Sequence, residues 1–505
     1  MQAVRSRFNY LFRSTKGLVL VAIALIALVT AIWGTLSGPL AEMGVKDVTV
    51  RVLGMDLNPA EREGRIIILY HVIAQAVIAI EVYLITRIIP MKPGRQETIN
   101  ATITVGYITS LIFGLAFAYF GHNYIYHGLF IAGQTLVFFA GVMLLEALWP
   151  WQKAYHVTDR ELSHWGNIDL ERVAFFTMAV CTLISAVFGA VAGANFGNEF
   201  TAFLAEDVVR NPNKPILQRA VIGHLHIMLT LIAIAITLII GRWFDFRGAL
   251  HKIAMPLMIV GTIITSVGAW SVTWVSWAHT TIYVGSVGVM LAALMLVIFG
   301  WRKLINEQGG AGGSFGQKIR ALLKDPLKFG PLWQMVFMNF TVSGVGIFMA
   351  VKLDEIIRVW PWREERITLT GHWHILSGII ATIILMYYAD MAGLKGWLRQ
   401  WFGWAVIIGS DIAFAAVTVF SMKRLFISEE TQQPLVNTTM ILADFGLALV
   451  LVMLAALMIW RLADLFAARG RWQHELADER PELAEPAAPD EEPIDALRTA
   501  GGMTR

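Results

Sequence analysis

The stretch GHWHILSGIIATIILMYYADMAGLKG, residues 371–396, combines two histidines with an apolar run long enough to cross a membrane. A second stretch, GHLHIMLTLIAIAITLIIGRWFDFRG at 223–248, has the same layout: it opens with Gly-His-x-His and ends with an aspartate and glycines. A weaker copy, YHVIAQAVIAIEVYLITR, occupies residues 70–87. Self-similarity of this kind indicates a fold assembled from repeated units.

The composition predicts the class of protein. Of the 505 residues, 56% are hydrophobic and 15% are charged, whereas an ordinary soluble domain has about 25% charged residues. The single cysteine excludes a disulfide framework and a cysteine-based metal site. We therefore predict an all-α integral membrane protein.

Twelve apolar runs meet the length that a bilayer requires, about 20 residues in a helix. Because backbone groups cannot be left unpaired in lipid, each run should be helical. The twelve predicted spans are 17–38, 66–90, 100–121, 125–148, 172–197, 220–241, 250–274, 277–300, 330–352, 367–390, 398–420 and 437–466.

Lysine and arginine gather in residues 1–16 and in the loops after the second, sixth and eighth spans. The positive-inside rule therefore places both termini in the cytoplasm. Residues 17–466 would form the twelve-helix membrane domain. Residues 467–505 are acidic, rich in proline and poor in apolar residues, and predict a disordered cytoplasmic tail.

The second, sixth and tenth spans carry the repeated stretches, so these helices run in one direction with histidines near their outer ends. We expect a threefold-like bundle in which they converge. Positions two apart on a helix point about 200° apart, so His372 and His374 would serve different sites. A histidine inside a membrane is costly unless it is paired or ligating. Imidazole suits haem iron, copper or non-haem iron, although hydrogen bonding is the alternative for any single histidine.

The order His71, His224, His279, then His372 and His374, across twelve spans resembles the catalytic subunit of the haem–copper oxidases, a family that includes the NO reductases. The Gly-His-x-His segment is most similar to the cbb-type oxidase and NO reductase branches. The segment WAHTTIYVG, which holds His279, is similar to the family's WAHHMFTVG. The resemblance implies a twelve-helix, pseudo-threefold fold.

Two haems b are implied by this resemblance. His71 and His374 would be the axial ligands of a low-spin haem, and His372 the proximal ligand of a high-spin haem. Lys423 and Arg424 would pair with haem propionates, or else anchor the chain at the membrane interface.

A second metal, copper or non-haem iron, is implied beside the high-spin haem. His224 and His279 would ligate it, with His226 as a candidate third ligand. The sequence departs from the family here: Thr280 follows His279 where the family has a second histidine, and Met228 stands where oxidases have tyrosine and NO reductases glutamate.

The function implied is that of a terminal reductase in the lipid of a bacterial cytoplasmic membrane, with no nucleic-acid partner. It would take electrons from cytochrome c, or from a cytochrome c subunit, and reduce O2 to water or, alternatively, NO to nitrous oxide. Its catalytic residues would be His372, His224 and His279. Two other readings stay open. One is a bis-His electron-transfer cytochrome in which His224 or His226 binds a haem. The other is a transporter built on repeats.

Overall fold

The computed structural model describes residues 2–37, 40–57, 59–121, 123–164, 166–196, 216–275, 277–357, 359–428, 431–467 and 469–480. Within these residues, twelve helical segments are long and apolar enough to cross a membrane. The protein is thus an all-α, multi-pass membrane protein, and each of the twelve predicted spans is confirmed.

The membrane-spanning elements are α2 (Thr15–Ser37), α4 (Pro59–Ile88), α5 (Pro93–Phe120), α6 (Tyr124–Ala147), α7 (Leu170–Phe196), α9 (Ile216–Trp243), α10 (Gly248–Ser271), α11 (Ala278–Glu307), α13 (Pro326–Phe337) with η4 (Met338–Gly344) and α14 (Val345–Val351), α15 (Trp362–Met391), α16 (Gly396–Met422) and α17 (Gln432–Phe466). The remaining elements are α1 (Gln2–Arg13), η1 (Ala41–Val45), α3 (Lys46–Leu53), η2 (Lys153–Tyr155), β1 (Ser163–His164), β2 (Ile168–Asp169), α12 (Phe315–Leu322), η5 (Leu353–Ile357), η6 (Lys423–Leu425) and α18 (Arg471–Glu479).

Local sequence signals explain where several helices begin. Pro93 stands at the first turn of α5, where its missing N–H costs no hydrogen bond. Asn123 caps α6, since its side chain accepts hydrogen bonds from the backbone N–H groups of Ile125 and Tyr126. These signals set where the chain enters two neighbouring antiparallel spans, at opposite ends of the bundle.

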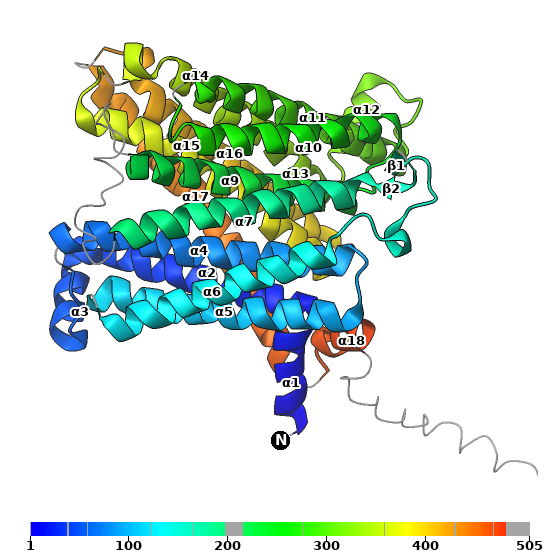
Figure 1. The fold of residues 1–505 in the computed structure, drawn as a ribbon, viewed down its shortest axis with the longest axis horizontal. Coiled ribbons are helices and arrows are strands. Elements are labelled where there is room, and N and C mark those ends of the chain that lie inside the picture. The colour runs from blue at the N-terminus through cyan, green and yellow to red at the C-terminus, as the bar shows by residue number, and fades with distance from the viewer. Residues whose placement is uncertain are drawn as a thin grey trace, which may run out of the picture.

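The helices pack in three groups of four with the same order of neighbours. In the first group, α2 packs on α4, α4 on α5, and α5 on α6. The same sequence of contacts recurs through α7, α9, α10 and α11, and again through α13, α15, α16 and α17. Figure 1 shows all of these helices running roughly side by side, with α3 and α14 at one end and α12, β1 and β2 at the other.

Glycine brings together the last two helices of each group. A Cβ on Gly106 of α5 would lie 3.0 Å from the carbonyl oxygen of Gly133 on α6. A Cβ on Gly261 of α10 would lie 2.8 Å from the carbonyl oxygen of Gly285 on α11. Gly409 of α16 repeats this contact, also at 2.8 Å, against α17. Small residues allow membrane helices to approach this closely, and the recurrence agrees with the predicted threefold repeat.

The ninth span is not a regular α-helix. It continues from α13 through the π-helical turn η4 into α14. A π turn holds one residue more than an α turn and is frequent at functional sites. It therefore changes which residues of α14 face the neighbouring helices α15 and α16.

The C-terminal tail was predicted to be disordered from residue 467, and this is wrong for residues 471–479. They form α18, whose Trp472 and Leu476 are buried. The helix packs against both α1 and α17, and α1 and α18 lie together below the bundle in Figure 1. The acidic composition hid a short amphipathic segment. Residues 481–505 lie outside the described part.

Candidate functional site

The three helices that carry the repeated histidine stretches, α4, α9 and α15, meet near their N-terminal ends. α9 packs on both α4 and α15. α4 and α15 meet through Tyr70, whose hydroxyl lies 3.4 Å from Nε2 of His374. The convergence that the repeat predicted is therefore present, and a histidine takes part in each of the three helix–helix contacts.

His71 of α4 faces His224 of α9. Their imidazole rings are nearly parallel, with centres 6.1 Å apart and planes inclined by 11°. Both side chains are half-buried. The two rings thus lie at the same depth in adjacent helices.

α7 fixes the orientation of His224. The ring nitrogen Nδ1 lies 2.8 Å from the backbone carbonyl oxygen of Ser185, to which it can donate. Gly189, one turn further along α7, leaves the space that the ring fills: a Cβ there would lie 2.5 Å from Cε1 of His224. Trp270 of α10 donates to the Ser185 hydroxyl at 3.1 Å. The carbonyl contact leaves Nε2 as the nitrogen that can face a ligand.

His226 points to another side of α9, as the spacing of two residues requires. It packs edge-on against Trp373 of α15, with ring centres 5.3 Å apart. Trp373 in turn lies 5.6 Å from the ring of His372. An aromatic side chain therefore separates the two histidines at the α9–α15 contact.

His372 and His374 lie on opposite sides of α15, and this part of the helical argument is confirmed. His372 lines a small cavity against η4, α14 and α16. His374 packs against Tyr70 with ring centres 6.3 Å apart, and Tyr70 packs against Trp33 of α2. The pairing of His71 with His374 on one haem stays a prediction, because the contacts described for them are to His224 and Tyr70.

The predicted ligands of a second metal do not come together. Among the residues that the structure describes, no group of three histidine, cysteine, aspartate or glutamate side chains could hold a metal ion. His279 is exposed in the first turn of α11, His226 is also exposed, and His224 faces α4 and α7. These three residues therefore do not fit a shared copper or iron ion.

Lys423 and Arg424 follow α16 in η6. Lys423 is buried, pairs with Glu364 of α15, and lies 4.7 Å from the ring centre of Phe420. Arg424 is half-buried. A haem propionate would compete with Glu364 for Lys423, so the role of both basic residues stays a prediction.

The separation of His71 and His224 matches that of two imidazoles that bind one haem iron. Two imidazoles that bind one metal from opposite faces have ring centres roughly 6 Å apart, because each metal–nitrogen bond is about 2 Å long. The observed 6.1 Å matches this separation. A ligating histidine usually donates its other nitrogen to a carbonyl or carboxylate, which holds the ring in place. Ser185 provides that contact for His224.

Sequence reasoning missed the residues around the histidines. Tyr70 stands next to His71 in the weakest repeat, and this adjacency was the available signal. Ser185 and Gly189 lie on α7, outside every repeated stretch, and nothing local marks them. Their role depends on which helix packs beside α9.

No protein-family model matches the chain, and no curated protein matches it.

Proposed function

We propose that this chain is a haem b-containing electron-transfer protein of the membrane, with His71 and His224 as axial ligands of one haem between α4 and α9. The observation that carries the proposal is the near-parallel pair of imidazoles with centres 6.1 Å apart. Histidine inside a membrane usually marks function. The support from α7 explains why one of these rings is held in a single orientation.

A haem at this pair would supply reversible one-electron chemistry, and the protein would supply ligands, orientation and insulation. The Ser185 carbonyl would hold His224 in the tautomer that leaves Nε2 free. The pair lies at the end of the bundle that charge asymmetry places away from the cytoplasm. Cytochrome c, or a cytochrome c subunit, would therefore donate electrons at the outer face of a bacterial cytoplasmic membrane.

A terminal reductase is the second candidate function. The order of the histidines along the chain favours it, and so does the meeting of α4, α9 and α15. It would need a second haem on His372 with one face open to O2 or NO. The dispersal of His224, His226 and His279 does not favour it.

Reduced-minus-oxidised spectra of histidine variants test the haem ligands. His71→Ala and His224→Ala should each remove the bis-His haem b spectrum, whereas His374→Ala should retain it. His226→Ala is the matched control, because it stands two residues from His224 on the same helix and faces Trp373. Loss of the spectrum in His374→Ala, with retention in His224→Ala, would instead support the pairing that the family resemblance implies.

Carbon monoxide separates the two candidate functions. A haem with two histidine ligands has no open position, so its reduced spectrum should not change when carbon monoxide is added. A shift of the reduced spectrum would favour the reductase. Purified protein without haem would contradict both candidates and favour the transporter reading.

A further inference from the structure

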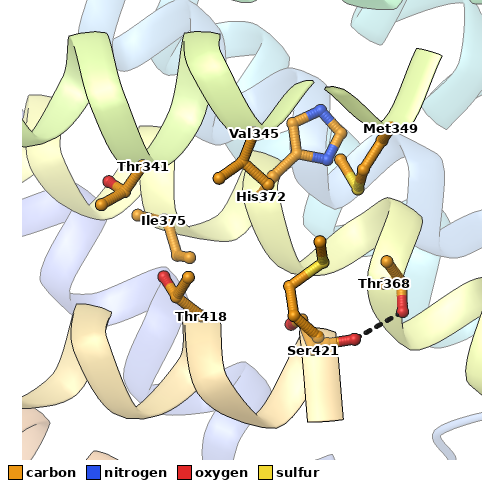
Figure 2. Close-up of a pocket in the computed structure, with 9 residues that line it drawn as sticks. Thr341, Val345, Met349, Thr368, His372, Ile375, Thr418 and Ser421 are labelled. Carbon is orange, nitrogen blue, oxygen red and sulfur yellow. Dashed lines mark hydrogen bonds between the residues drawn. The ribbon is translucent and has the colours of Figure 1, made fainter. Parts of the chain in front are cut away.

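A cavity of about 10 Å³ lies between α15, α16 and the irregular ninth span. It offers room for about one ion or water molecule, far less than the roughly 300–1,000 Å³ of typical cofactor and ligand pockets. Figure 2 shows the imidazole of His372 and the side chain of Met349 at one side of it. Its lining residues are Thr341, Val345, Met349, Thr368, His372, Ile375, Thr418, Ser421 and Met422.

Nδ1 of His372 is buried and has no hydrogen-bond partner. The carbonyls of Thr368 and Leu369 approach the ring from its own helix, yet neither meets hydrogen-bond geometry with Nδ1. A buried polar atom without a partner is unfavourable, because it has lost its hydrogen bonds to water. An exception of this kind needs an explanation, and a bound ion is one.

The threonine hydroxyls of the cavity are already engaged. Thr341 and Thr418 donate to backbone carbonyls within their own helices. Thr368 donates to the carbonyl of Ser421 at 2.6 Å, as the dashed line in Figure 2 shows. They are therefore poor candidates for binding a ligand through a hydroxyl proton. Two buried polar atoms of the lining are without a hydrogen-bond partner among the described residues: Nδ1 of His372 and Oγ of Ser421. Of these two, the imidazole nitrogen is the metal ligand.

Two thioethers lie in the same cavity as this nitrogen. Met349 is 2% exposed and Met422 is 7% exposed, and both belong to one packed cluster. They come from separate elements, α14 and the end of α16, and line the cavity together with His372 of α15. We propose that His372, Met349 and Met422 form a binding site for copper(I).

The chemistry of the lining favours copper(I) over other common ions. Thioether sulfur is a soft ligand that selects copper(I), and imidazole also binds copper. None of the described residues that line the cavity is a carboxylate, so a divalent ion would remain poorly neutralised in an apolar setting, where unpaired charge is costly. A monovalent ion that prefers sulfur fits this lining best, because it binds thioethers and brings the least charge into the apolar cavity.

This site does not rest on the haem proposed at His71 and His224. It gives His372 a ligand other than the high-spin haem implied by the family resemblance. The two assignments of His372 are therefore alternatives, and one set of variants can separate them.

The test is a copper(I) titration of the purified full-length protein in detergent, under reducing conditions, with a chromogenic copper(I) chelator as competitor. The wild-type protein should bind one copper(I) ion through this site, with sulfur scattering in its X-ray absorption spectrum. Met349→Leu and Met422→Leu keep the size and apolar character of the side chain. Each should weaken binding at least tenfold.

Met338→Leu is the matched control, because Met338 is buried in the neighbouring η4 but does not line the cavity. It should bind copper(I) as the wild type does. The proposal fails if the wild type binds no copper(I), or if both methionine variants bind as tightly as the control. It also fails if His372→Ala loses a haem while copper(I) affinity is unchanged. Gel filtration and thermal unfolding establish that each variant is folded.

Discussion

The two ends of the helical bundle satisfy their buried polar groups in different ways. At the end with both termini, Arg461 is 1% exposed at its side chain and pairs with Glu475 at 2.6 Å. Tyr10 donates to the same carboxylate at 2.8 Å. At the histidine end, Nδ1 of His372 has no hydrogen-bond partner, and His71 faces another histidine.

This difference separates groups that hold the fold from groups that we propose bind a ligand. Burial raises the pKa of the Tyr10 phenol, so its hydroxyl stays protonated and can donate to Glu475. Arg399 at the same end pairs with both Asp325 and Asp390. Charged groups there meet opposite charges within the chain, as Lys423 also does with Glu364 at the histidine end. The imidazoles at the histidine end differ, since His71 and His224 lie beside each other and His372 shares a cavity with two methionines.

The largest expected effect is on stability, from breaking the ion pair between Arg461 and Glu475. Glu475→Ala leaves Arg461 buried without its main counter-charge and should lower the free energy of unfolding by about 3–5 kcal/mol. Chemical unfolding in detergent, followed by tryptophan fluorescence, would measure it. Glu355→Ala is the control, since Glu355 pairs with Lys352 at the exposed surface, where a pair contributes about 0–1 kcal/mol. Equal effects in both variants would remove the contrast between buried and exposed pairs.

A smaller effect is expected at Gly189, which lies against the imidazole ring of His224. Gly189→Ala would place a Cβ 2.5 Å from Cε1 of the imidazole, so the ring must move or the helices must separate, at a cost of about 1–3 kcal/mol. We expect loss of haem and a changed haem spectrum, measured as haem per protein.

Gly128→Ala on α6 is the matched control, because a Cβ there meets nothing within 4 Å. Full haem content in both variants would show that the contact of His224 with α7 has no part in ligation.

The smallest effect is expected from the hydrogen bond between Trp270 and Ser185, the residue whose carbonyl contacts His224. Trp270→Phe keeps an aromatic ring but removes the donor to Ser185, which should cost about 0.5–1.5 kcal/mol and shift the haem midpoint potential slightly. Redox titration would measure the shift. Trp401→Phe, at a side chain that is 70% exposed, should leave the potential unchanged, and a similar shift there would argue against a specific effect.

Much of the fold was predictable because few backbone structures can cross a lipid bilayer. Apolar length identified all twelve spans, and the histidine repeat predicted that α4, α9 and α15 meet. The spacing of two residues also predicted opposite directions for His372 and His374. These conclusions depend on local periodicity or on repetition, which the sequence displays directly.

The residues that contact the histidines were harder to predict from the sequence. That His224 faces His71 depends on the rotation of α9 between α4 and α7, which no local pattern fixes. The direction of the Met349 side chain depends on the π turn η4, which precedes α14. The helix α18 was missed because its few apolar residues, Trp472 and Leu476, sit within an otherwise charged tail.

The π turn η4 also determines which changes of length the ninth span tolerates. A π turn accommodates one residue beyond the α-helical number. Deleting one residue within 338–344 can therefore convert it to an α turn and leave α14 in its present register. The same deletion within 345–348 would rotate Met349 about 100° away from its present direction. A gap in this span among related sequences would thus keep or change the direction of Met349, the methionine that we propose as a copper(I) ligand, according to which side of Gly344 it falls on.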